Sequence, residues 1–168
     1  MTSTFLVPTA IQSLVQLPAS CQADYISLKV LFHGGAPLPS SLYRAAVELL
    51  PSATLLNNYG TTETLCVLLG HKDGLVISDR PLDGVQIRVM QNGQEVAADG
   101  QSIGELQVLS PFSMKGYIGA AATADGAWYE TGDLCTIQQD GSVNICGRVD
   151  DMMLVAGEKV FASKVLCS

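Results

Sequence analysis

The sequence has few charged residues, and most of them carry the same sign. Only 15% of its 168 residues are charged, and the formal net charge is −7. Nucleic acid and anionic membrane surfaces bind basic surfaces, so this composition argues against both as partners. A nucleotide is not excluded, because a divalent cation and local dipoles can balance its phosphates. Hydrophobic residues make up 48%, which excludes disorder and allows one domain with a buried core.

Long hydrophobic runs and paired cysteines are also missing. No apolar run reaches the ~18 residues of a membrane span. Pro8 and Pro18 interrupt the apolar N-terminal stretch, which carries no basic segment of the kind found in signal peptides. The five cysteines lie apart without a Cys-x-x-Cys pair, which predicts free thiols rather than a zinc site or disulfide framework. We therefore expect a cytoplasmic chain without a membrane span.

The first 74 residues alternate strand-like and helix-like segments. A short apolar run at residues 4–7 ends at Pro8, and the apolar runs at residues 28–32 and 54–57 predict two strands. Helical spacing at residues 10–15 and 42–50 predicts two helices, the second of them between the two strands. This order, with polar loops after the strands, is typical of the doubly wound pattern, so residues 1–74 are interpreted as part of a doubly wound α/β subdomain.

Two local boundaries can be predicted in this region. Ser40 is expected to cap the second helix and Pro51 to end it, with one apolar face between them. The strand at residues 54–57 leads directly into Tyr59-Gly60, which is expected to form a turn.

From about residue 75 the pattern becomes that of a β-rich subdomain. Short alternating segments predict strands at residues 85–89, 105–109, 134–138 and 142–146. Asn92-Gly93 and Asp140-Gly141 predict hairpin turns. We expect residues 75–149 to form a mainly antiparallel, barrel-like or sandwich subdomain. Residues 150–168 are expected to hold a hinge and the first hairpin of a C-terminal domain, truncated at its end.

Residues 58–63 carry groups suited to a nucleotide. Tyr59 offers a planar face for a base, and Gly60 allows a close approach of the chain. Thr61 and Thr62 offer hydroxyl and amide donors to phosphate oxygens. Glu63 is a candidate Mg²⁺ ligand, since Mg²⁺ takes one or two carboxylates together with substrate phosphates. The alternative is a helix start, with a threonine as cap and Glu63 in the first turn.

Three further segments carry candidate groups. Asp133, after Thr131-Gly132, could direct a carboxylate at two vicinal hydroxyls of a ribose, or could form an Asx-type turn. Arg148 could lie near the same sugar or phosphates, or in a solvated charged turn. The small residues at 34–36 could let a ligand ring lie against the backbone, or form an ordinary strand-to-helix turn.

The two histidines provide no catalytic base. His33 adjoins the glycines and could line a pocket, whereas His71 is expected at the surface. Neither has a carboxylate or serine at useful spacing. The sequence also lacks a serine-hydrolase elbow, a Walker loop and a zinc signature.

The order of five segments is more specific than any one of them. From residue 4 to residue 165 the chain resembles the adenylate-forming superfamily of acyl-CoA synthetases, nonribosomal peptide synthetase adenylation domains and luciferase-like enzymes. The segments that carry the resemblance are residues 31–38, 58–64, 104–108, 129–134 and 147–151.

The resemblance implies an ATP or AMP site with Mg²⁺. Thr62, near the α-phosphate, and Glu63, on the metal, would be the catalytic residues, and Asp150 would be the hinge between the domains. The implied nucleotide-binding residues are Gly34, Gly35, Ala36, Asn58, Tyr59, Gly60, Thr61, Thr62, Asp133 and Arg148. The implied acid pocket includes His33, Leu65, Val67 and Leu68.

The implied reaction joins a small carboxylic acid to a thiol. The acid attacks the ATP α-phosphate and releases pyrophosphate, and coenzyme A or the phosphopantetheine of a carrier protein then captures the acyl-AMP. The superfamily's phosphate loop and C-terminal lysine are not found in this sequence, so we expect a fragment that is inactive alone. Ala162 and Lys164 also depart from the family pattern. An adenylation-domain fragment and a non-catalytic AMP-binding or interaction module remain as alternatives.

Overall fold

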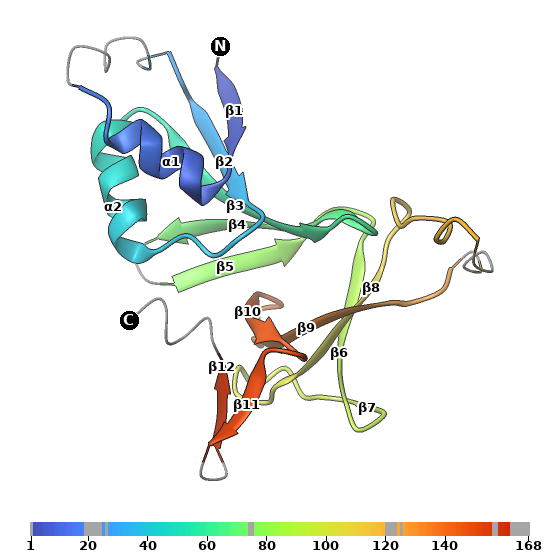
Figure 1. Cartoon of the computed structure of the whole chain (residues 1–168). Helices are drawn as coiled ribbons and strands as arrows, with labels where there is room; N and C mark the ends of the chain where they lie inside the picture. Colours follow the sequence, from blue (N-terminus) through green and yellow to red (C-terminus); the bar gives the residue numbers. More distant parts are fainter. Residues whose placement is uncertain are drawn as a thin grey trace.

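The computed structural model describes residues 2–18, 25, 27–73, 76–119, 124, 126–155 and 158–161. Ten strands form one open sheet in the order β1-β2-β3-β4-β5-β10-β9-β8-β6-β7 (Figure 1). A separate two-stranded sheet follows near the C-terminus. The fold is therefore mixed α/β, with a large and mostly antiparallel sheet.

The N-terminal part has the predicted alternation of strands and helices. Its strands are β1 (Ser3–Leu6), β2 (Val30–Gly34) and β3 (Thr54–Thr61). They pair in parallel and are connected by α1 (Pro8–Val15) and α2 (Ser40–Leu49). Parallel neighbours joined by helices are the arrangement expected from the sequence.

Both helices pack on the same face of these strands. Ile11 of α1 and Ala46 of α2 are completely buried, together with Leu31 of β2, in one hydrophobic cluster. Burying an isoleucine or leucine side chain contributes about 1.5–3 kcal/mol, so this cluster fixes the strands against the helices.

Two predicted boundaries in this part are wrong. Pro39, not Ser40, is the N-cap of α2, and no side-chain cap is present; Ser40 is the first helical residue. The fixed φ of proline suits the helix start without a side-chain acceptor. Tyr59-Gly60 is not a turn, because β3 continues through both residues as far as Thr61.

The chain continues as an antiparallel sheet. The predicted turns at Asn92-Gly93 and Asp140-Gly141 connect the hairpins β6–β7 and β9–β10. The elements are β4 (Leu65–Asp73), β5 (Val76–Pro81), β6 (Gln86–Gln91), β7 (Gln94–Glu95), β8 (Gly104–Leu109), β9 (Tyr129–Ile137) and β10 (Val143–Arg148). The strands β4 and β5 were not predicted from the sequence.

The sheet does not close into a barrel among the described residues. Its two halves join where β5 pairs with β10, and the one registered pair there is Asp79 with Val143. A second hydrophobic cluster spans this junction, with Leu68 of β4 buried together with Val89 of β6 and Leu106 of β8. The sheet therefore carries two separate clusters, one under the helices and one across the junction of the halves.

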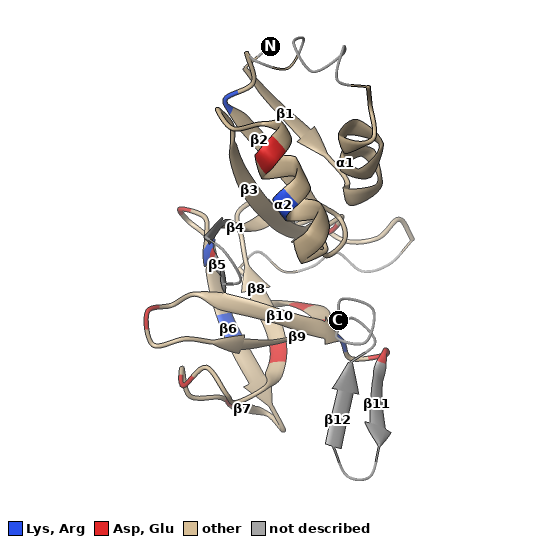
Figure 2. Cartoon of the chain, turned by 90° about the vertical axis from the view of Figure 1, so that its left-hand side faces the viewer, with Lys and Arg blue, Asp and Glu red and all other residues tan. Residues whose placement is uncertain are grey.

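The separate hairpin consists of β11 (Met152–Val155) and β12 (Glu158–Phe161) and agrees with the predicted hairpin after residue 150. Ala162 and Lys164, which depart from the family pattern, lie outside the described residues. No described helix has the length and apolar character needed to cross a bilayer. In the α/β part, few charged residues are present (Figure 2).

Candidate functional site

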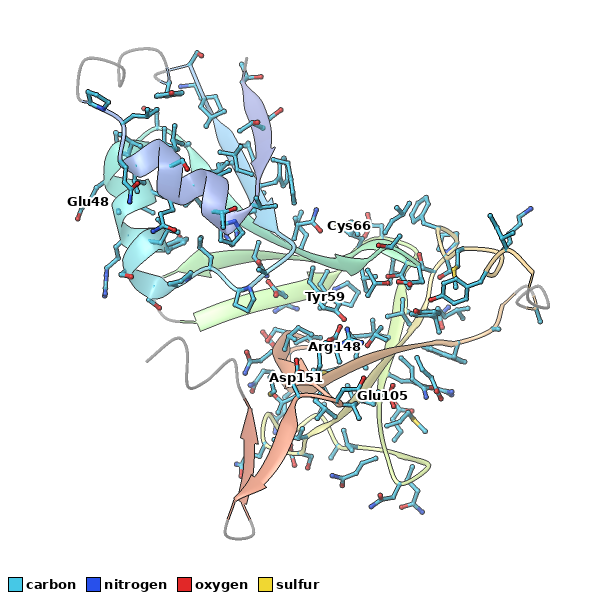
Figure 3. All side chains as sticks on the ribbon, in the orientation of Figure 1. Glu48, Tyr59, Cys66, Glu105, Arg148 and Asp151 are labelled. Carbon is cyan, nitrogen blue, oxygen red and sulfur yellow. The ribbon has the colours of Figure 1, made fainter. Side chains whose placement is uncertain are left out.

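Two sequence motifs meet at the junction of the two halves. The Tyr59 hydroxyl donates a hydrogen bond of 2.6 Å to Asp133 Oδ2, although the two residues are separated by 74 positions. Tyr59 lies on β3 and Asp133 on β9. Figure 3 shows Tyr59 and Arg148 on facing sides of this junction. The sequence hypothesis required this convergence.

A bulge in β9 determines the direction of Asp133. Glu105 pairs with Leu134 and Gln107 with Glu130, so the single residue Leu106 lies opposite residues 131–133. Within the bulge Gly132 has φ +72°, in the left-handed region that favours glycine. The Asp133 side chain therefore does not follow the regular alternation of side chains between the two faces of the sheet.

Hydrogen bonds stabilise this bulge. The Thr131 hydroxyl donates to the Leu106 carbonyl at 2.8 Å and accepts from the Asp133 amide at 3.1 Å. The Gly132 amide donates to Glu105 Oε1 at 3.1 Å. Asp133 is therefore held on a bulged strand, and the alternative of an Asx-type turn is wrong.

Arg148 lies beside Asp133 at the end of β10. The two residues are register partners, and Arg148 Nη1 is 3.4 Å from Asp133 Oδ1. The Arg148 side chain is 52% exposed, so part of its guanidinium faces solvent. Arg148 belongs to a paired strand, and the alternative of a solvated turn is wrong.

Burial and hydrogen bonding keep the Tyr59 hydroxyl protonated. Burial raises the pKa of Tyr59 well above its ordinary value, and the hydrogen bond to Asp133 and its negative charge raise it further. Tyr59 therefore donates to Asp133, which leaves other acceptor positions on this carboxylate for a ligand.

The segment after Tyr59 forms a tight hairpin turn between β3 and β4. The Thr61 and Thr64 hydroxyl oxygens are 3.0 Å apart, and the Thr64 amide donates to the Thr61 carbonyl at 3.3 Å. A Cβ on Gly60 would lie 1.7 Å from the Leu65 carbonyl oxygen, so the hairpin requires glycine there. The alternative of a helix capped by Thr61 or Thr62 is wrong, because no helix starts here.

Glu63 projects from this turn and is contacted by the segment that follows β8. The Tyr117 hydroxyl donates to Glu63 Oε1 at 2.8 Å, and the Met114 amide donates to the Glu63 carbonyl at 2.6 Å. The Tyr117 hydrogen bond is the main cause that lowers the pKa of the Glu63 carboxyl. Burial, followed by the Tyr117 hydroxyl and the Glu63 charge, raises the pKa of Tyr129 beside them.

Glu63 provides one carboxylate, which suits a metal site completed by substrate phosphates and water. The described residues contain no group of three or more His, Cys, Asp or Glu side chains able to hold an ion. A single carboxylate suits Mg²⁺ when substrate phosphates and water supply the other ligands. The donors present therefore fit a nucleotide-bound Mg²⁺ and not a metal held by protein ligands alone.

The glycine segment at the end of β2 lies beside the same motif. Gly34 is the register partner of Asn58, and a Cβ on Gly34 would lie 2.2 Å from the Asn58 carbonyl oxygen. Gly35 has φ +80°, and Ala36 is exposed. The approach of β3 therefore requires Gly34 to be a glycine, even without a ligand.

The predicted acid-pocket residues occupy different environments. Leu65 is 60% exposed, with φ +56°, whereas Val67 and Leu68 of β4 are completely buried in the cluster that also contains Val89 and Leu106. Tyr59 pairs with Leu68 and Gly60 with Cys66, which leaves Val67 as an extra residue in the strand. His33 is buried within β2. Their role as pocket walls remains a prediction.

Two other predicted residues can be placed only in part. Asp150 is exposed and lies in the turn between β10 and β11, and its hinge role remains a prediction. His71 belongs to β4, and its side chain lies outside the described residues.

A buried carboxylate near the site was not predicted. Asp79 is only 2% exposed, and Asn57 Nδ2 donates to its Oδ2 at 2.6 Å. Its Oδ1 lies over Gly70, where a Cβ would be 1.8 Å away. Burial raises the pKa of Asp79 to about 6, although the Asn57 hydrogen bond acts in the opposite direction.

Sequence reasoning also missed Glu105 and Tyr117. Both contact residues that are distant in sequence: Glu105 accepts a hydrogen bond from the Gly132 amide, and Tyr117 donates one to Glu63. Glu105 was part of a recognised segment without an assigned role, and Tyr117 carried no local signal. Only the folded arrangement brings these partners together.

Comparison with known proteins identifies the family. Residues 1–118 match the family model described as AMP-binding enzyme. A feruloyl-CoA synthase from Amycolatopsis sp is 30% identical, and the match covers 98% of this chain and 35% of that protein. A fatty acid–[acyl-carrier-protein] ligase, ScoC, from Streptomyces coeruleorubidus is 27% identical, with 98% and 34% covered.

Solved structures agree with these matches. The amide bond synthetase McbA from Marinactinospora thermotolerans superimposes with a TM-score of 0.81 at 29% identity, covering 98% of this chain and 35% of that one. The chain thus spans about a third of the length of the relatives it matches. With the family model covering most of its residues, the chain belongs to the AMP-binding enzyme family.

Proposed function

We propose that this chain is the middle part of an ATP-dependent acid–thiol ligase of the acyl-CoA synthetase type. The enzyme activates a small carboxylic acid as an acyl-AMP with release of pyrophosphate, and a thiol then captures the acyl group. The contact between Tyr59 and Asp133 carries this proposal, because it brings the two motifs into one site.

Each group has a role in holding the nucleotide. The adenine lies between the Tyr59 ring and the segment at residues 34–36. Asp133 accepts hydrogen bonds from the ribose hydroxyls, and the exposed part of Arg148 binds the sugar or the phosphates. Asp133 already accepts from Tyr59 and Arg148, but a carboxylate has about four acceptor positions, so ribose can be added without breaking either contact.

The phosphate groups of ATP bind mainly to uncharged hydrogen-bond donors. Thr62 supplies a hydroxyl and an amide at the hairpin turn and Thr61 supplies a hydroxyl, since the Thr61 amide donates to Thr64 Oγ1. Glu63 would hold a Mg²⁺ that offsets phosphate charge. Such catalysis depends on positioning and charge stabilisation, so it requires no nucleophilic side chain. The acceptor is coenzyme A or a carrier-bound phosphopantetheine; relatives of both kinds match the chain.

The test uses Asp133→Asn and Asp133→Ala, with exposed Glu48→Ala as the control. One or two hydrogen bonds to a charged group contribute about 1.5–3 kcal/mol each, so ATP affinity should fall by about tenfold or more. Isothermal titration of ATP into the chain measures this, and thermal unfolding verifies that the variants fold. Unchanged affinity in folded Asp133→Asn would remove the ribose assignment.

A further inference from the structure

The segment after β8 contacts the turn that carries Glu63 in two places. The Tyr117 hydroxyl donates to the Glu63 carboxylate at 2.8 Å, and the Met114 amide donates to the Glu63 carbonyl at 2.6 Å. Both the side chain and the backbone of Glu63 are therefore fixed by residues more than fifty positions away.

The segment itself is ordered at its start by Ser110. Ser110 Oγ accepts from the Phe112 amide at 3.1 Å, and its carbonyl accepts from the Ser113 amide at 3.2 Å. This turn follows directly on β8, the strand that faces the Asp133 bulge. The same strand thus connects the ribose-binding group to the contact on Glu63.

An exposed glutamate needs such a contact if its carboxylate is to be held in one orientation. Glutamate has many rotamers, and ordering it on a surface turn is entropically unfavourable. Tyr117 donates to Oε1, and a carboxylate has about four acceptor positions, so other positions on Glu63 remain for a metal or its water ligands. Tyr129 of β9 interacts with both groups.

We propose that Tyr117 is a positioning residue that holds the Glu63 carboxylate in the orientation that binds the metal of a metal–nucleotide complex. The inference rests on the proposed function for the metal, but the contact itself does not. Tyr117 touches neither substrate nor metal, and it acts through Glu63. A nucleotide without metal should therefore bind equally well with or without the tyrosine hydroxyl.

The test compares the wild-type chain with Tyr117→Phe and with Ile118→Ala, which changes a fully exposed neighbour in the same segment. ATP binding is measured by titration in EDTA and again with Mn²⁺, whose bound fraction is followed by electron paramagnetic resonance. We expect Tyr117→Phe to weaken Mn²⁺-dependent binding by about fivefold, the effect of one hydrogen bond, and to leave binding in EDTA unchanged. Ile118→Ala should change neither.

A second measurement needs no ligand. Amide hydrogen exchange at Met114 should become faster in Tyr117→Phe and stay unchanged in Ile118→Ala, because the Met114 amide is bonded to Glu63. The positioning role is overturned if Mn²⁺-dependent and metal-free binding weaken equally, or if neither changes. Absence of ATP binding by the wild-type chain would refute the nucleotide site itself, and Met114 exchange unchanged by Tyr117→Phe would then refute the contact separately.

Discussion

Replacing Asp79 by asparagine should stabilise the chain at neutral pH. Asp79 is buried, its Oδ2 accepts one hydrogen bond from Asn57, and its Oδ1 has no partner among the described residues. A buried carboxylate in this setting favours the neutral form. Asparagine keeps the shape and the acceptor for Asn57 but has no charge to bury.

The magnitude follows from the pKa. Burial raises the pKa of Asp79 from its ordinary 3.8 to about 6. At about 1.4 kcal/mol per pKa unit, ionisation of the folded chain above that pH costs about 3 kcal/mol of unfolding free energy. Below about pH 4 the carboxyl is protonated in both folded and unfolded chains, so the cost is absent there. It grows between about pH 4 and 6, where the unfolded chain releases its proton first.

Urea unfolding of the wild type and Asp79→Asn at several pH values measures this difference. The variant should match the wild type near pH 4 and exceed it by about 3 kcal/mol above pH 7. Asp83→Asn, at an exposed turn position, is the control and should show no such pH-dependent gain. A difference that is the same at both pH values, or greater stability of the wild type at neutral pH, would refute the reasoning.

Two further outcomes are expected. The chain alone should show no carboxylate-dependent ATP–pyrophosphate exchange, because the sequence lacks the family's phosphate loop and C-terminal lysine; exchange above background would contradict this. Gly34→Ala should lower the unfolding free energy by about 1–3 kcal/mol in urea titrations, since the added Cβ would lie 2.2 Å from the Asn58 carbonyl oxygen. An unchanged midpoint would mean that β2 and β3 can separate at no cost.

The sequence predicted those elements whose signal is local. The helix at residues 42–50 has an apolar face with Ala46 and Leu50, and both are buried. Asn92-Gly93 and Asp140-Gly141 favour tight hairpins by their own conformational preferences, and both connect hairpins as predicted. The meeting of Tyr59 and Asp133 was predicted from motif order, not from local pattern.

The elements that were missed depend on distant partners. The strands β4 and β5 pair with each other. The apolar run at residues 65–69 of β4 is followed by polar residues, and β5 has two apolar residues before polar ones, so neither strand shows the clean alternation that predicts a strand. Tyr59-Gly60 was expected to turn, but pairing with β4 keeps it extended. The contacts of Glu105 and Tyr117 arise only when separated strands come together, and so no local spacing could indicate them.

The bulge opposite Leu106 has a consequence for recognising this site in other sequences. Side chains along a strand alternate between two faces, and three residues opposite one alter that alternation at Asp133. Deleting a single residue from this stretch would keep the aspartate yet turn its carboxylate away from Tyr59. The spacing between Glu130 and Leu134 therefore matters as much as the acidic residue itself for the contact with Tyr59.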